Sequence, residues 1–229
     1  MNNVIEKFKG GLIVSCQALE DEPLHSSMIM SRMAYAAYLG GAKGIRANSK
    51  EDIIEIKKKV DLPILGIVKR DYADSPIYIT PTMREIDELV EAKTDIIALD
   101  ATDRLRPNGK TMESFVKDIK NKYKDIPLMA DISTYEEGIN AWKAGFDLVS
   151  TTLSGYTPYS VKSDKPDFEL IERLSRDITI PVIAEGKVWV REEAEEALKR
   201  GAYAVVVGTA ITRPMEITRR FVNCIEGNV

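Results

Sequence analysis

The stretch Ile64-Leu65-Gly66-Ile67-Val68-Lys69-Arg70 decides the fold class of this chain of 229 residues. Its apolar part is short, rich in β-branched residues and introduced by Pro63, which is typical of a fully buried strand. We expect this strand to end at Lys69, which places the ammonium group of Lys69 at the edge of the apolar core. Alternation along the strand predicts that Arg70 points away from that core.

Other apolar runs also end at charged residues. These ends are Asp100, Asp131 and Glu185. The carboxyl ends of parallel strands converge when the strands close into a barrel. We therefore expect one polar ring that contains these carboxylates, Lys69 and Arg46 of the second strand.

The segments before and after this stretch alternate strand and helix. Thr82 with Glu85, and Thr134 with Glu137, have the spacing of capping boxes, which mark helix starts. The expected strands are 12–16, 44–47, 64–69, 96–100, 128–131, 147–151, 182–185 and 204–208. The expected helices are 27–39, 49–59, one from 82 onward, 112–123, 134–144, 167–176, 191–200 and 214–225.

This alternation predicts a single (β/α)8 TIM-barrel domain over residues 1–229, with a short N-terminal extension at 1–10. A doubly wound open sheet is the alternative, but that fold requires a glycine-rich turn after the first strand. The turn here, Gln17-Ala18-Leu19, has no glycine.

Composition argues against several classes of function. The net charge of −4 and the lack of a basic stripe predict no nucleic acid partner. No apolar run approaches the ~20 residues that cross a bilayer, and Met1–Gly10 lacks the apolar stretch of a secretory signal. We expect a cytoplasmic protein without a membrane partner, in which Cys16 and Cys224 are reduced and buried.

No metal site is expected. The chain has one histidine, His25, and no Cys-x-x-Cys or His-x-x-x-His spacing. His25 follows a turn before the first long helix, and we expect it to be buried there as a hydrogen-bond partner that anchors a loop.

The polar residues at the expected rim also have structural interpretations. Arg46 can form a salt bridge with Asp100 or Glu185, and both Asp100 and Asp131 can accept hydrogen bonds from loop amides. The convergence of these charges on Lys69 is the better indication of function, because gathering charges at a dry rim has a desolvation cost.

The ends of the last two strands carry a more specific pattern. Gly186 follows the seventh strand and Gly208-Thr209 follows the eighth, and the corresponding loops of barrels often bind phosphate. Glycines let backbone amides approach an anion, and a helix N-terminus adds partial positive charge. Arg213 can add a bidentate contact. We favour a phosphate site here over glycines that serve only as turns.

Several longer motifs are ordered along the chain. They are 11–19 (GLIVSCQAL), 21–27 (DEPLHSS), 66–70 (GIVKR), 97–102 (IALDAT), 129–133 (MADIS), 151–157 (TTLSGYT) and 210–214 (AITRP). Together they resemble the N-acetylmannosamine-6-phosphate 2-epimerase family from about Gly11 to Phe221. The resemblance implies the same barrel and a cofactor-independent isomerase. Such an enzyme interconverts N-acetylmannosamine 6-phosphate and N-acetylglucosamine 6-phosphate in bacterial sialic acid catabolism, and the resemblance suggests a homodimer.

The resemblance also implies roles for individual residues. Lys69 and Glu185 correspond to the catalytic pair. The resemblance implies that Gln17, Arg46 and Asp131 bind the sugar. It also implies that Arg213 and the backbone amide of Thr209 bind the phosphate. The loop that holds Tyr156 and Tyr159 is expected to cover the sugar as a lid or to be a solvated loop with one packed tyrosine.

Inversion at C2 of the sugar requires a base that removes the C2 proton. The sequence does not decide which residue is this base. Lys69 acts as a base only when neutral, so its pKa must fall from ~10.4 toward ~7. Burial and Arg46 lower that pKa, whereas Glu185 raises it. Either Lys69 moves the proton while Glu185 stabilises its charged form, or charged Lys69 is an acid and Glu185 is the base.

Two other functions remain open. Lys69 can form a Schiff base with a sugar-phosphate carbonyl, as an aldolase does. The barrel can also bind a phosphosugar without chemistry. A buried base beside an acid favours an enzyme, because binding alone requires no such pair.

Overall fold

The computed structural model describes residues 3–227, which form a closed barrel of parallel strands and confirm the predicted fold class. Neighbouring strands pair in chain order, and the last strand pairs with the first. The strands are β1 (Leu12–Cys16), β2 (Gly44–Asn48), β3 (Ile64–Ile67), β4 (Ile96–Asp100), β5 (Leu128–Asp131), β6 (Leu148–Ser150), β7 (Val182–Glu185) and β8 (Ala204–Val207).

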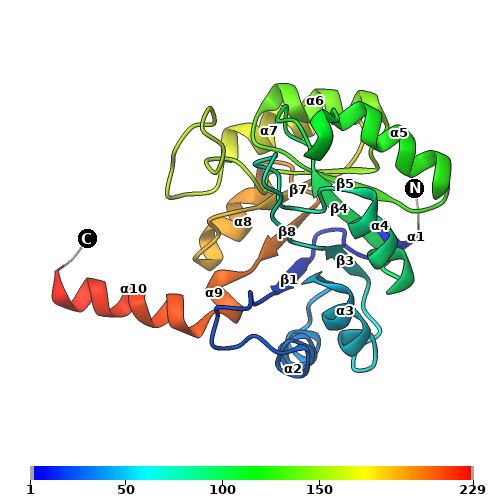
Figure 1. Ribbon diagram of the computed structural model, residues 1–229. Helices are drawn as coiled ribbons and strands as arrows, with labels where there is room; N and C mark the ends of the chain where they lie inside the picture. The colour runs from blue at the N-terminus through cyan, green and yellow to red at the C-terminus, as the bar shows by residue number, and fades with distance from the viewer. Residues whose placement is uncertain (1–2, 228–229) are drawn as a thin grey trace.

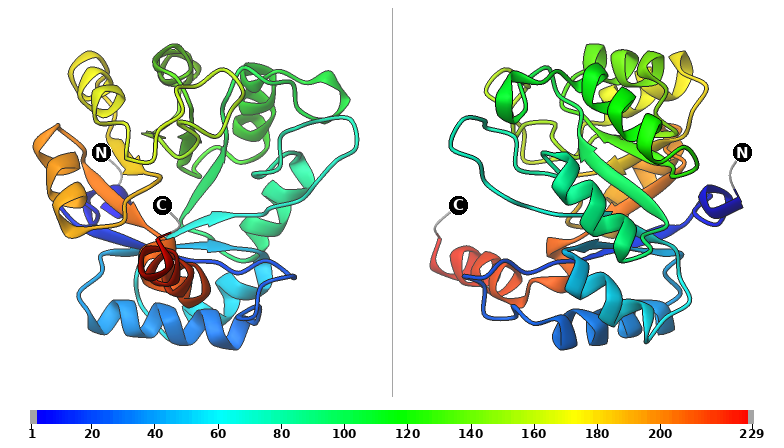
Figure 2. Two further views of the ribbon diagram at one scale, coloured as in Figure 1. Left: turned by 90° about the vertical axis from the view of Figure 1, so that its left-hand side faces the viewer. Right: turned by 45° about the vertical axis from the view of Figure 1, so that its right-hand side comes forward.

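The longer helices surround the strands as an outer layer (Figure 1, Figure 2). The helices are α1 (Asn3–Glu6), α2 (Ser27–Leu39), α3 (Lys50–Lys57), α4 (Met83–Glu91), the 3-10 helix η1 (Pro107–Gly109), α5 (Met112–Lys122), α6 (Tyr135–Ala144), α7 (Phe168–Asp177), α8 (Arg191–Lys199), α9 (Thr209–Thr212) and α10 (Pro214–Glu226). Both predicted capping boxes form, at Thr82 and Thr134. No helix among the described residues is long and apolar enough to cross a membrane.

The barrel interior has an apolar layer below a polar one. Every second residue of a strand faces inward, so one strand contributes to both layers. The apolar layer contains Ile13, Leu65, Ile96, Met129, Leu148, Ile183 and Ala204. The next inward positions, two residues closer to the carboxyl ends, are polar on five strands, where they hold Ser15, Arg46, Asp131, Ser150 and Glu185. On β3, β4 and β8 they hold Ile67, Ala98 and Val206. The interior is therefore packed at one end and polar at the other.

The third strand is shorter than predicted. It ends at Ile67, and Lys69 instead forms an isolated antiparallel bridge with Ile79. The connection after β3 thus folds back along its own strand. Lys69 still lines the barrel interior, whereas Arg70 turns outward and forms an ion pair with Glu85 of α4, as alternation predicted.

The first described residues close the amino-terminal end of the barrel. Ile5 and Phe8 are buried in the interior apolar cluster. Gly44 makes room for Phe8, because a Cβ added to this glycine would lie 2.4 Å from Phe8 Cε1. Residues 3–10, which we expected as an extension, therefore pack against the barrel.

The last helix, α10, stands out from the body of the molecule (Figure 1). None of its residues is buried. Cys16 of β1 is buried as expected, but the expectation for Cys224 is wrong, since it lies exposed on α10.

Candidate active site

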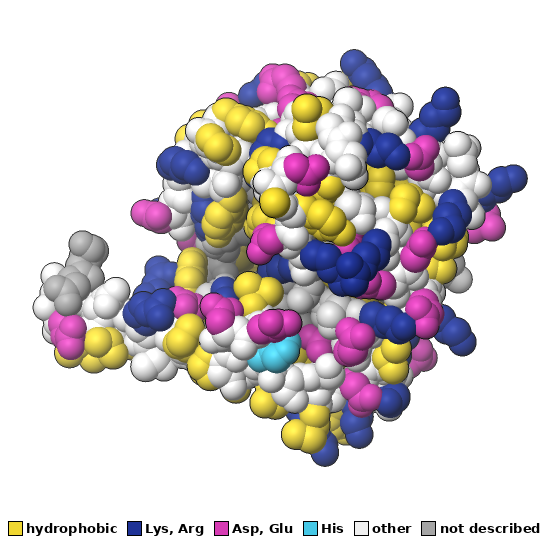
Figure 3. All heavy atoms as spheres, viewed as in Figure 1, with side chains coloured by type: hydrophobic (Ala, Val, Ile, Leu, Met, Phe, Trp, Pro, Cys, Tyr) yellow, Lys and Arg dark blue, Asp and Glu magenta, His cyan; other side chains and the backbone are white. Residues whose placement is uncertain are grey.

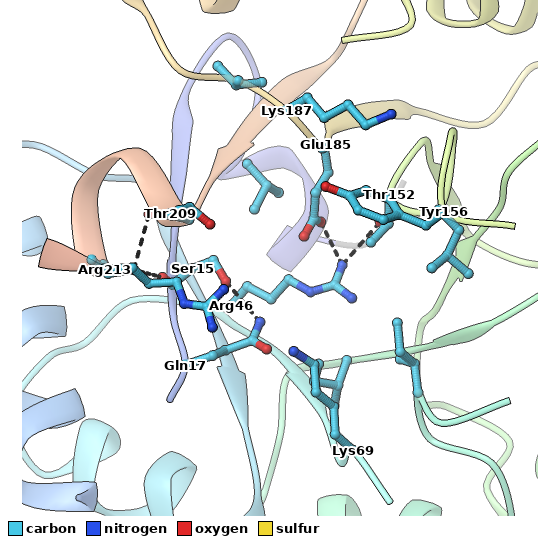
Figure 4. Close-up of a pocket in the computed structure, with 18 of the residues that line it drawn as sticks. Ser15, Gln17, Arg46, Lys69, Thr152, Tyr156, Glu185, Lys187, Thr209 and Arg213 are labelled. Atoms are coloured by element: carbon cyan, nitrogen blue, oxygen red, sulfur yellow. Dashed lines mark hydrogen bonds and ion pairs between the residues drawn. The ribbon is translucent and has the colours of Figure 1, made fainter. Parts of the chain in front are cut away.

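A cavity of about 320 Å³ lies at the carboxyl end of the barrel. Its walls come from the ends of β1, β2, β3, β7 and β8 and from the loops that follow β6, β7 and β8 (Figure 4). The expected site residues that line it are Gln17, Arg46, Lys69, Tyr156, Glu185, Gly186, Gly208, Thr209 and Arg213. Asp131 is the expected site residue that does not line it, because its side chain is fully buried below Arg46.

Arg46 is the centre of a buried ion-pair network. Its Nη1 and Nη2 donate to the two carboxylate oxygens of Asp131 at 3.0 and 2.5 Å. The same Nη1 donates to Glu185 Oε2 at 2.6 Å. A bidentate contact fixes the guanidinium plane, so Asp131 orients Arg46 and Arg46 orients Glu185. Asp131 also accepts a 2.6 Å hydrogen bond from Thr152.

This network corrects two structural interpretations made from the sequence. Asp131 was expected, in its structural interpretation, to accept from loop amides, but its oxygens accept from Arg46 and Thr152. Asp100, a suggested partner of Arg46, binds the amide of Thr102 and the side chain of Arg104 instead. The capping interpretation therefore holds for Asp100 alone, and Arg46 pairs with the carboxylates of β5 and β7.

The side chains of Lys69 and Gln17 both line the cavity (Figure 4). Burial, together with the positive charges of Arg46 and Arg213, lowers the pKa of Lys69 to about 8 against the opposing effect of Glu185 and Glu22. A lysine with this pKa is partly neutral near neutral pH, which lets it accept a proton.

The carboxyl group of Glu185 also titrates in an unusual range. Burial, with the nearby charge of Asp131, raises the pKa of Glu185 to about 7 against the opposing effect of Arg46. The cavity therefore holds two groups, Lys69 and Glu185, that titrate near neutral pH.

The predicted phosphate side lies where β7 and β8 end. Gly186 has a φ of +104°, a conformation that disfavours side chains, and Gly208 passes close to β1, since an added Cβ would lie 3.2 Å from Ser15 Cβ. Thr209 opens the short helix α9 directly after Gly208. Arg213 follows α9, and its guanidinium is bound to Glu22 of the connection between β1 and α2.

Gln17 and Tyr156 face the cavity from opposite loops. Gln17 Nε2 donates to Ser15 Oγ at 2.8 Å, and its Oε1 is buried without a hydrogen-bond partner among the described residues. An unpaired buried carbonyl is costly, so this oxygen is suited to accept from a ligand hydroxyl or amide. The Tyr156 ring lies 5.0 Å from the ammonium of Lys187.

Sequence reasoning missed Lys187, Thr152 and Glu22, which also line the cavity. Thr152 was detectable, because it lies two residues after Ser150 and faces the same side. Lys187 was detectable from its place directly after Gly186 in a loop at the active face. His25 was placed correctly as a loop anchor, since Nδ1 lies 3.1 Å from the Ala18 carbonyl, but its side chain is exposed rather than buried.

Among residues 3–227, no group of three or more His, Cys, Asp or Glu side chains could hold a metal ion.

The cavity at the carboxyl end of the barrel contains a partly neutral lysine and a carboxyl group. These features define a class of enzymes that move protons on small molecules. The pairing is typical of acid–base chemistry on a carbon acid.

Comparison with known proteins narrows this class. A family model described as putative N-acetylmannosamine-6-phosphate epimerase matches residues 30–227. A protein of Caldanaerobacter subterraneus subsp. tengcongensis, named putative N-acetylmannosamine-6-phosphate 2-epimerase, is 61% identical over 224 residues, 98% of this chain and 94% of its own. The solved N-acetylmannosamine-6-phosphate 2-epimerase of Clostridium perfringens is 57% identical, with a TM-score of 0.94 over 97% of this chain and 96% of its own.

The chain therefore belongs to the N-acetylmannosamine-6-phosphate 2-epimerase family. A more distant structure, a thiamine phosphate pyrophosphorylase from Pyrococcus furiosus, is 18% identical with a TM-score of 0.62 and shares the fold alone.

Proposed function

We propose that this protein inverts C2 of N-acetylmannosamine 6-phosphate to give N-acetylglucosamine 6-phosphate, a step of sialic acid and amino sugar catabolism. The observation that carries the proposal is Lys69, whose pKa is lowered to about 8 in a cavity that also holds Glu185. The solved relative from Clostridium perfringens bears the name of this reaction.

The reaction requires cleavage of the C–H bond at C2, which is acidic only when C1 is an open-chain aldehyde. The sugar ring must open, a base must take the C2 proton, and a proton must return on the other face. Neutral Lys69 is the proposed base. Glu185 would stabilise the ammonium that forms and assist ring opening. The substrate and product have the same oxidation state, so the step needs no redox cofactor.

Substrate contacts are assigned by position in the cavity. Gln17 has an unpaired carbonyl for a sugar hydroxyl or the acetamido group, and Arg46 offers positive charge near the enolate oxygen. Tyr156 would cover the sugar. The proposed phosphate ligands are Gly186, Gly208, Thr209 and Arg213. For Asp131 the proposed sugar contact stays a proposal, and its bidentate contact with Arg46 supports a role in orienting that arginine as well.

We also propose that the protein acts in the cytoplasm as a homodimer, built from one barrel domain per chain. The helix α10 supports an association between copies. Phe221 and Ile225 of α10 are 68% and 83% exposed and lie four residues apart on the helix, and contiguous exposed apolar surface marks interaction sites. Figure 3 shows apolar side chains on this projecting helix.

NMR spectroscopy of N-acetylmannosamine 6-phosphate with the protein in D2O tests the reaction and the proton route together. If Lys69 alone takes and returns the proton, the product carries deuterium at C2, with some original hydrogen returned at early times. Something must then bring the ammonium to both faces, either rotation of the intermediate or a relay through the substrate. Fully deuterated product from the first turnover would instead indicate two dedicated bases. Absence of product would contradict the proposed function.

A further inference from the structure

Glu22 and Arg213 form an ion pair in the wall of the cavity. They are 191 residues apart in the chain, and both line the cavity. Glu22 Oε1 accepts from Arg213 Nε at 2.7 Å and also from Nη2. The side chain of Glu22 is 12% exposed and that of Arg213 is 36% exposed, so the contact is partly shielded from solvent. Shielding strengthens an ion pair compared with one at the surface.

The carboxylate of Glu22 is itself held by its own turn. Its Oε2 accepts from the Leu19 amide at 2.8 Å, and the Glu22 amide donates to the Leu19 carbonyl at 2.9 Å. Both carboxylate oxygens are thus engaged, one by the turn and one by the arginine. The turn therefore sets the position of the carboxylate, and the carboxylate sets the position of the guanidinium.

The geometry leaves part of Arg213 available for a ligand. A guanidinium carries five N–H groups in a rigid plane, and Glu22 binds the edge made by Nε and Nη2. The Nη1 group lies outside this contact. A long flexible side chain loses rotamer freedom when it binds a ligand, and prior fixation of one edge reduces that loss.

We propose that Glu22 is a positioning residue that holds Arg213 in the orientation in which it receives the phosphate of the substrate. This inference rests on the proposed function for the identity of the substrate, but its central claim is about binding of a phosphate group. The alternative is that Glu22 competes with phosphate for Arg213. Its attachment to the Leu19 amide and its contact with a single edge of the guanidinium favour positioning.

Glu22 also affects Lys69 through its charge. The charged groups that act on Lys69 are Arg46, Arg213, Glu185 and Glu22. Glu22 raises the pKa of Lys69, so removal of its negative charge lowers that pKa further. The rise of activity with pH should then occur at lower pH, whatever Glu22 does for the loop.

The test compares Glu22→Gln, Glu22→Ala and Arg213→Ala, singly and as the double variant Glu22→Gln with Arg213→Ala. We expect KM for N-acetylmannosamine 6-phosphate to rise about tenfold in Glu22→Gln, the change for loss of one good contact, with kcat within about twofold. The double variant should bind no more weakly than Arg213→Ala, because Glu22 acts through Arg213. Glu20→Gln, which removes an exposed carboxylate from the same connection, is the control.

Calorimetry with inorganic phosphate keeps this test separate from the proposed function. We expect Glu22→Gln to weaken the Kd for phosphate about as much as it raises KM. Unchanged or tighter phosphate binding in this variant would overturn the proposal, as would additive losses in the double variant. If the wild-type protein binds phosphate but does not turn over the sugar, the epimerase proposal fails while the phosphate result still decides the role of Glu22.

Discussion

At the scale of single residues, Lys69 depends on its neighbours for its proposed role. An isolated lysine is almost fully charged at neutral pH and cannot accept a proton. Burial, with Arg46 and Arg213 near it, brings the pKa of Lys69 down to about 8. The carboxylates of Glu185 and Glu22 limit the decrease and allow the ammonium to form after proton transfer.

Replacement of Lys69 by alanine tests its role directly. We expect Lys69→Ala to lose measurable turnover, because the substitution removes the proposed C2 base, while the protein remains folded and still binds the phosphosugar. Circular dichroism and calorimetry check folding and binding. The exposed Lys59→Ala is the control. Turnover of Lys69→Ala near the wild-type rate would exclude this lysine as the base.

The pH dependence distinguishes the two assignments of the base. If neutral Lys69 is the base, kcat/KM should rise with pH and level off above about 8, because the neutral fraction grows from about one tenth at pH 7 to about nine tenths at pH 9. If Glu185 is the base and charged Lys69 is the acid, kcat/KM should rise through about 7 and fall above about 8. A profile measured from pH 5.5 to 9.5 separates a plateau from a bell.

At the scale of elements, Glu137 joins three segments that surround the site. Its Oε2 accepts from the amides of Ser133 and Thr134 at the start of α6, and its Oε1 accepts from the amide of Asp103 and the hydroxyl of Tyr159. The loop after β6, which also carries Tyr156, is therefore tied to the barrel by a buried carboxylate.

Removal of this carboxylate should destabilise the protein more than loss of an ordinary cap. We expect Glu137→Ala to lower the free energy of unfolding by about 3 kcal/mol, because it leaves several buried donors unpaired. Thr134→Ala, which removes a single capping bond, should cost about 1 kcal/mol. The exposed Glu136→Gln is the control and should stay within about 0.5 kcal/mol. Denaturant titrations measure all three; equal losses for Glu137→Ala and Thr134→Ala would contradict this account.

The elements also show what the sequence could predict. The ends that were predicted for strands and long helices lie within two residues of those in the structure, because apolar periodicity and capping residues mark them. The short helices α1, η1 and α9 were missed, since three or four residues have too little periodicity. The ion pairs between charged residues at the strand ends were predicted only in part. Whether Arg46 binds Asp131 or Asp100 depends on barrel closure, a relation between distant strands that no local pattern encodes.

At the scale of the whole molecule, α10 is the long helix that contributes least to the core. The other long helices bury residues against the strands, whereas α10 buries none. A second copy of the chain that covered Phe221 and Ile225 would remove this apolar surface from water.

Sedimentation velocity tests this association. The wild-type protein should sediment at twice the chain mass of 25.6 kDa at micromolar concentration. The double variant Phe221→Glu with Ile225→Glu should sediment at the chain mass, because charges replace the apolar contact. Lys117→Glu, at an exposed position of α5, is the control. Wild-type protein that sediments at the chain mass would contradict the proposed homodimer.

The packing of Phe8 against Gly44 affects how a substrate enters the cavity and how the product leaves it. With the interior apolar layer filled and Phe8 seated beneath it, the described residues leave the carboxyl-end mouth as the route into the cavity. A sugar phosphate must then enter and its epimer must leave by the same mouth, so the two exclude each other. Turnover in either direction should slow as the other epimer accumulates, in the manner of a competitive inhibitor, and the exchange of sugars at the mouth sets an upper limit on the rate.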